Sequence, residues 1–196
     1  MAVMALVTSA SFGANVAPGD RDYPQSNPHP TKFLLVHGTI DEALDVRFSV
    51  AWRANNPQCQ YAVSRMAGVY NNYTASYALE IAREGTRFTS RIAIDGVLPG
   101  RCQWRFAGVN FGGRAGAMTT LIATNSYPLK AGQSPNGVVE LRCASSSRNA
   151  PGFPGPSLDC RWPPQEDPGA SVRGGTLWWH PEASDLEVHI SADPEG

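Results

Sequence analysis

The segment "HPEASDLEVH", residues 180–189, holds the residue types that bind metals or transfer protons. His180 opens it, and Asp185, Glu187 and His189 would share one face of an extended strand. These positions motivate one hypothesis, an enzyme with a noncanonical site. However, their spacing matches no metal signature, and alternating polar residues are what any solvated strand face requires. We therefore predict no metal and no cofactor.

Catalytic and nucleotide-binding motifs are absent from the sequence. It contains no G-x-S-x-G elbow, no H-E-x-x-H helix and no Walker loop. The glycine-rich "GVNFGGRAG", residues 108–116, lacks the Lys-Ser/Thr ending of a phosphate-binding loop, so we expect a turn between strands. With a formal net charge of -1 and 17% charged residues, no basic stripe indicates nucleic acid. We predict a protein that is neither an enzyme nor a nucleic-acid binder.

The stretch "GRCQWRF", residues 100–106, alternates between two kinds of side chain. In a strand that starts at residue 101, these would form two rows on opposite faces. The inward row is Cys102, Trp104 and Phe106, and the outward row is Arg101, Gln103 and Arg105. An indole beside a disulfide is a frequent core element of small sandwiches. The inward row is therefore assigned to the core, and the outward row is a candidate binding face, since arginine is enriched in interfaces.

The segment "GGTLWWHPE", residues 174–182, carries a second candidate binding site at Trp178, Trp179 and His180. Adjacent residues of an extended strand point to opposite faces, so we expect at least one of the two indoles on the surface. An exposed tryptophan can stack on a sugar ring or anchor a protein partner. It can equally cover a neighbouring strand.

Four cysteines indicate two disulfides, because none of them forms a CxxC pair and their number is even. Three pairings are possible. We favour Cys143–Cys160, which brackets the proline- and glycine-rich "SSSRNAPGFPGPS", and this leaves Cys59–Cys102.

The elements that must position these residues are short strands. "LDVRFSVAWR", residues 44–53, alternates strictly, and "DLEVHISA", residues 185–192, does the same. Residues 73–82, "YTASYALEIA", are compatible with a helix or a strand, and we favour the strand. About nine short strands separated by Gly, Pro and Asn predict an all-β antiparallel sandwich, Ig-like or a small barrel, stabilised by two disulfides.

Domain organisation follows from composition. Residues 1–17 resemble a secretory leader, and the proline-rich residues 18–31 read as a linker. We expect one β domain over residues 32–192 and a tail over 193–196. No stretch approaches the roughly 20 apolar residues of a transmembrane helix. A periplasmic or secreted protein is expected.

These patterns favour a protein that recognises another protein. The specific hypothesis is an immunity protein or inhibitor that neutralises a secreted toxin or enzyme, with loops and one sheet face as its contact surface. The alternative is a carbohydrate or cell-wall binding module that uses Trp178 or Trp179. Composition does not separate the two.

Two disulfides predict that unreduced protein from an oxidising compartment contains no free thiol. Thiol titration of the unfolded, unreduced chain measures this directly. Four free thiols would overturn both the pairing and the compartment.

Overall fold

The computed structural model describes residues 16–112, 119–124, 137–146, 157–161, 177–179 and 183–193, and in these it contains thirteen strands and no helix. The strands are β1 Phe33–Ile40, β2 Arg47–Arg53, β3 Gln60–Ser64, β4 Val69–Asn72, β5 Thr74–Leu79, β6 Ala82–Glu84, β7 Arg87–Ala93, β8 Arg105–Gly112, β9 Thr119–Thr124, β10 Gly137–Ser146, β11 Ser157–Arg161, β12 Leu177–Trp179 and β13 Asp185–Ala192. The all-β class is confirmed. The leader, except its last two residues, lies outside the described part of the chain.

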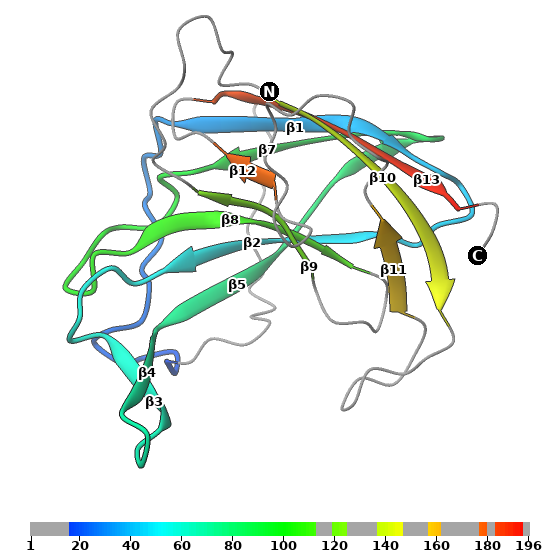
Figure 1. Cartoon of the computed structure of the whole chain (residues 1–196). Helices are drawn as coiled ribbons and strands as arrows, with labels where there is room; N and C mark the ends of the chain where they lie inside the picture. The colour runs from blue at the N-terminus through cyan, green and yellow to red at the C-terminus, as the bar shows by residue number, and fades with distance from the viewer. Residues whose placement is uncertain are drawn as a thin grey trace, which may run out of the picture.

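Two larger sheets face one another, and a small third sheet projects from one end (Figure 1). The six-stranded sheet has the order β11-β10-β13-β1-β7-β6, and the five-stranded sheet has the order β12-β9-β8-β2-β5. The third sheet consists of β3 and β4 alone. The larger sheets therefore form the body that carries the β3–β4 hairpin.

One hydrophobic core lies between the two larger sheets. Period-two alternation supplies it from each strand, as in β7, where Phe88, Ser90 and Ile92 are buried while the residues between them are exposed. The rings of Phe48 in β2 and Phe88 in β7 stack with centroids 5.3 Å apart and join the sheets. The most completely buried large side chains include Phe111, Leu34, Ile40, Leu186, Ile190, Val36, Val109, Val139 and Val188.

Seven of the ten described strand pairs are antiparallel, in line with the predicted antiparallel sandwich, and three are parallel. β13 pairs in parallel with both β1 and β10, and β12 pairs in parallel with β9. Side-chain alternation reports which face of a strand is buried, but it carries no information about the direction of a distant neighbour. The described residues form thirteen strands where about nine were expected, because they include very short strands such as β6, Ala82–Glu84, whose three residues are all exposed.

Two strand assignments near the site have different outcomes. The ambiguous residues 73–82 form strand β5 and the beginning of β6, so the choice of a strand is confirmed. The strand expected from residue 101 begins only at Arg105, because residues 98–103 turn back on themselves. Trp104 donates its backbone N–H to the carbonyl of Pro99, 2.8 Å away.

The segment predicted as a linker lies against the β domain. Ser26 forms a β-bridge with Val97, and Asn27 donates its backbone N–H to the carbonyl of Gly96. The carboxylate of Asp95 accepts hydrogen bonds from the backbone N–H groups of Thr31 and Lys32. Residues 26–32 are therefore held along the loop that follows β7, while the predicted domain boundaries stay a prediction.

Both predicted disulfides are confirmed. Cys143 and Cys160 are directly opposite one another in the antiparallel pair β10–β11. Cys59, just before β3, bonds to Cys102 in the turn before β8. Disulfides of this kind fit a non-cytoplasmic protein.

Gly38 in the middle of β1 offers a test of this packing. Its φ of +145° is open to glycine alone, and an added Cβ would overlap the backbone carbonyl of Val188 in β13. We expect Gly38→Ala to lower the free energy of unfolding by about 4 kcal/mol, through the clash and the disfavoured φ together.

Gly68 is the matched control for chemical denaturation of the Gly38 variant. Its φ is +64°, but a Cβ there would meet nothing within 4 Å. Gly68→Ala should therefore cost only about 1 to 2 kcal/mol, the conformational penalty alone. Equal costs for the two variants would contradict the packing described for β1 and β13.

Candidate functional site

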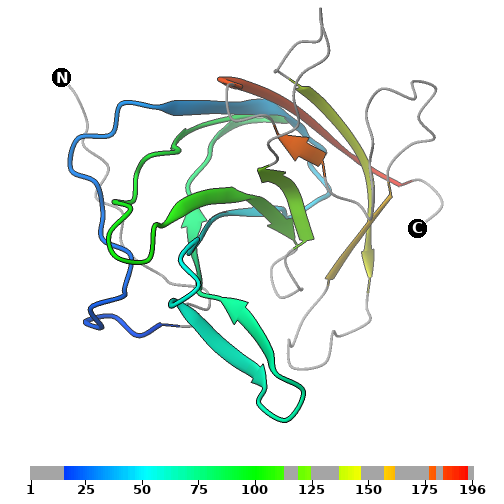
Figure 2. The ribbon, with the colours of Figure 1, turned by 60° about the vertical axis from the view of Figure 1, so that its left-hand side comes forward.

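The β3–β4 hairpin stands away from the body of the domain in both views of the ribbon (Figure 1, Figure 2). Its strands pair only with each other among the described strands, with Tyr61 opposite Asn71 and Ala62 opposite Tyr70. The register shifts between Ala62 and Ser64. Both outer edges of the hairpin therefore lack a neighbouring strand in the described part of the chain.

Contacts at its base hold the hairpin in place. The Cys59–Cys102 disulfide joins the start of β3 to the turn before β8. Asn72 donates its side-chain N–H to the carbonyl of Ala54 and accepts a hydrogen bond from the Gln60 amide, each at 2.8 Å. A two-stranded hairpin is marginally stable alone in water, so these contacts are what keep it ordered.

The hairpin exposes apolar side chains instead of burying them. Met66 in the connecting turn is fully exposed, and Val63, Val69 and Tyr70 are 55%, 45% and 54% exposed. All four residues lie on one short projecting hairpin, whereas single exposed apolar residues are common on any surface. Such a local concentration of exposed apolar side chains is a feature of protein-binding surfaces.

Two arginines lie where the hairpin leaves the body. Arg53 is the last residue of β2, and its antiparallel neighbours are Arg105 in β8 and Thr74 in β5. Both guanidinium groups are on exposed residues, and neither has a carboxylate partner among the described residues. We call Arg53 and Arg105 the arginine pair. Like charges directly opposite one another in a sheet repel.

The predicted outward row is exposed as expected, but its three members do not act together. Arg105 belongs to the arginine pair. Arg101 instead forms an ion pair with Asp22, its Nε lying 2.7 Å from Oδ1 and its Nη2 bonding Oδ2. Gln103 sits in the turn with a φ of +53° and donates its side-chain amide to the carbonyl of Gly100. Arg101 and Gln103 therefore stabilise the loop at the hairpin base.

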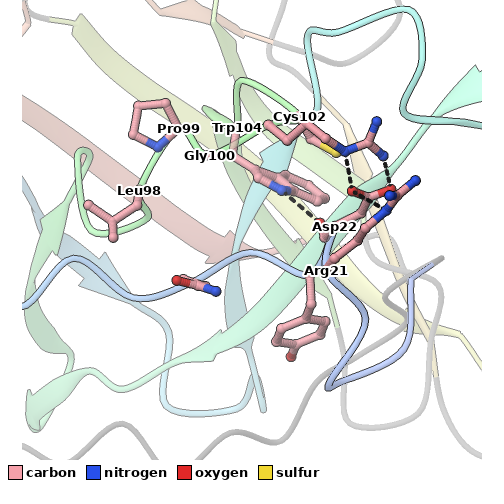
Figure 3. Close-up of a pocket in the computed structure, with 10 residues that line it drawn as sticks. Arg21, Asp22, Leu98, Pro99, Gly100, Cys102 and Trp104 are labelled. Atoms are coloured by element: carbon pink, nitrogen blue, oxygen red, sulfur yellow. Dashed lines mark hydrogen bonds and ion pairs between the residues drawn. The ribbon is translucent and has the colours of Figure 1, made fainter.

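The predicted inward row is buried, with Cys102, Trp104 and Phe106 exposed by 7% at most. Trp104 also donates its indole N–H to the backbone carbonyl of Asp22 at 3.1 Å. Figure 3 shows this bond beside the Arg101–Asp22 ion pair. Together they fasten the N-terminal segment to the turn before β8.

A shallow hollow of about 430 Å³ opens between the N-terminal segment and that turn (Figure 3). Its lining includes Arg21, Tyr23, Leu98, Pro99 and Trp104. The same turn is tied to the hairpin base, because Asn56 donates its side-chain N–H to the carbonyl of Arg101. The hairpin, the arginine pair and the hollow thus lie around one end of the domain, which we call the hairpin end.

The tryptophan candidates lie on a separate element. Trp178 and Trp179 belong to β12, at the edge of the five-stranded sheet beside β9. The structure describes their backbone and not their side chains. His180 lies outside the described residues. Their predicted binding role stays a prediction.

The acid and histidine residues of β13 pair with neighbours on the outer face of the six-stranded sheet. His189 Nε2 lies 3.1 Å from Glu187, and its Nδ1 lies 2.9 Å from the hydroxyl of Thr39. His37 in β1, which sequence reasoning missed, lies 3.2 Å from both carboxylate oxygens of Asp185. The structure thus forms two half-exposed His–carboxylate pairs.

One group of three potential metal ligands comes together in the described residues, namely Asp22, Cys59 and Cys102. The two sulfurs are bonded to each other, so neither offers a thiolate. This group does not form a metal centre while the disulfide is intact. The two His–carboxylate pairs do not converge into a set of three.

Comparison of the chain with protein-family models, with curated proteins and with solved structures finds no match in any of the three. The described residues contain no helix that is long and apolar enough to cross a membrane.

Sequence reasoning missed the hairpin and one of the two paired arginines. A usable signal was present, since "QYAVSRMAGVYNNY", residues 60–73, places a glycine-containing turn between two β-prone runs. Acidic residues are also absent from the whole stretch 46–79. Arg53 ends the clearest alternating run but becomes notable only when Arg105 is found opposite it.

The Asp22–Arg101 ion pair predicts a pH dependence. The hydrogen bonds from Arg101 hold the pKa of the Asp22 carboxyl below its ordinary value. A depressed pKa in the folded state means that ionised Asp22 stabilises the fold above its unfolded pKa of about 3.9. This contribution is lost as the pH falls through the folded-state pKa.

Chemical denaturation at about pH 7 and about pH 3 measures this loss. Wild type should lose more stability on acidification than Asp22→Asn, because the variant has no carboxyl to protonate at this position. Arg101→Gln should remove most of the same difference. Equal losses in wild type and Asp22→Asn would show that the ion pair does not contribute.

Proposed function

We propose that this is an exported protein, periplasmic or secreted, whose function is to bind another protein through the hairpin end. Most specifically, we propose an immunity protein or inhibitor that neutralises a secreted toxin or enzyme. The single observation that carries this proposal is the projecting β3–β4 hairpin with Val63, Met66, Val69 and Tyr70 exposed on it.

The energetics of the hairpin support a binding role. Full burial of an exposed apolar side chain contributes about 1.5 to 3 kcal/mol, so these side chains can contribute substantially to the stability of a complex. The Cys59–Cys102 disulfide and the hydrogen bond of Asn72 hold the base of the hairpin. The hairpin therefore loses less conformational entropy when it binds a partner. A preorganised hairpin suits an inhibitor, because little of the contact energy is offset by the cost of ordering the hairpin on binding.

The glycan-binding and enzyme hypotheses have less support. The glycan-binding hypothesis depends on Trp178 and Trp179, for which the structure describes the backbone alone. The second depends on the β13 residues, where Asp185 and Glu187 each pair with a histidine on an open sheet face.

Site-specific photo-crosslinking in the periplasmic or secreted fraction of the source cell tests the proposal. A photoreactive phenylalanine analogue in place of Met66 should give one defined protein adduct. The matched control is the same analogue in place of Val138, which is 59% exposed on β10 of the six-stranded sheet. It should give no adduct. No adduct at position 66, or the same adduct at both positions, would contradict the proposal.

Replacing apolar contacts provides the second measurement. Val63→Ser combined with Met66→Ser should weaken binding of the crosslinked protein at least about tenfold, since each buried side chain is worth more than 1.4 kcal/mol. Thermal unfolding should be unchanged because both side chains are exposed in the unbound protein. Val138→Ser should alter neither binding nor stability.

A further inference from the structure

The arginine pair places two cations directly opposite each other in the five-stranded sheet, and neither has a carboxylate partner among the described residues. Arg101 pairs with Asp22, Arg83 donates to the carbonyl of Gly85, and Arg91 lies over the ring of Phe33 at 3.6 Å. Arg53 and Arg105 lie opposite each other in β2 and β8, and no described Asp or Glu forms an ion pair with either of them. Residues in such opposite positions have Cβ atoms about 4.5 to 5.5 Å apart, so their charges repel.

The stretch of chain that carries Arg53 contains no acidic residue. Residues 46–79, which include β2, the whole hairpin and β5, contain Arg47, Arg53 and Arg65 but no Asp or Glu. The hairpin end therefore presents positive charge at the base and near the tip of an apolar projection. The whole chain contains 17 acidic and 16 basic residues, so the absence of Asp and Glu from residues 46–79 is a local feature.

We infer that Arg53 and Arg105 form a carboxylate-binding site, and that the partner is a protein presenting Asp or Glu side chains beside an apolar pocket for the hairpin. The identity of the partner rests on the proposed function. A guanidinium offers parallel N–H donors that match the two oxygens of a carboxylate, and two adjacent guanidinium groups accept a pair of carboxylates or share one. Binding such a group would also relieve the repulsion between the arginines.

Other occupants fit the observations less well. A nucleic acid needs a basic track along its backbone, whereas here the two arginines adjoin an apolar hairpin with the single charge of Arg65. A second copy of this chain would bring Arg65 to Arg65 and pair to pair if hairpins met symmetrically, with no acid in residues 46–79 to compensate. An acidic protein surface satisfies both the charge and the apolar side chains.

Titration of the isotope-labelled protein with a hexaglutamate peptide tests the site without the natural partner. The side-chain Nε–Hε resonances of Arg53 and Arg105 should shift together and saturate. Arg47 is the matched control, because it is exposed at the other end of the same strand, opposite Gly112. Its resonance should not follow the same curve, and hexaglutamine should shift none of them.

Three outcomes would overturn the assignment. The first is equal shifts at Arg47 and at the arginine pair, which would indicate nonspecific attraction. The second is a saturable response to inorganic phosphate or to anionic lipid vesicles without a response to hexaglutamate. The third is an unchanged affinity for hexaglutamate, measured by calorimetry, in the Arg53→Gln, Arg105→Gln double variant.

Association kinetics with the partner identified by crosslinking at position 66 distinguish a failure of this inference from a failure of the proposed function. At low salt, the Arg53→Gln, Arg105→Gln variant should associate about tenfold more slowly, and added salt should shrink the difference. Arg47→Gln should associate at the wild-type rate. Absence of any adduct at position 66 counts against the proposed function, whereas an adduct with unaltered rates in the double variant overturns only the carboxylate site.

Discussion

The Cys59–Cys102 disulfide is the constraint on which the hairpin end depends. An isolated pair of short strands does not bury enough surface to hold one conformation, and β3 and β4 have no other strand beside them in the described structure. The disulfide fixes their base to the turn before β8, and the Arg101–Asp22 ion pair continues this chain of contacts to the N-terminal segment. A covalent bond thus performs the stabilising role that a core performs for the larger sheets.

Burial at the end of β2 determines which residues are left outside. Trp52 packs edge-on against Tyr77 and Phe106 inside the domain, with ring centroids 5.6 and 6.0 Å away. Because successive side chains of a strand alternate, a buried Trp52 places Arg53 on the outside, and a buried Phe106 does the same for Arg105. The core therefore enforces the proximity of two like charges.

The sequence predicted those features that alternation or cysteine number encodes. The all-β class, the burial of Cys102, Trp104 and Phe106, and both disulfides were of this kind. Strand direction was not predictable, since β1 and β13 meet across about 150 residues. The role of Arg101 was missed because its partner, Asp22, lies 79 residues away in a segment that looked like a linker.

The position of β13 determines the order in which the six-stranded sheet can form during synthesis. This late strand lies between β1 and β10 in the middle of its sheet, so the sheet remains incomplete until residues 185–192 have emerged. A chain delivered N-terminus first must keep β1 without one of its two neighbours for most of that time. Until β13 arrives, β10 and β11 have no strand through which to join β1, so the two halves of this sheet assemble last.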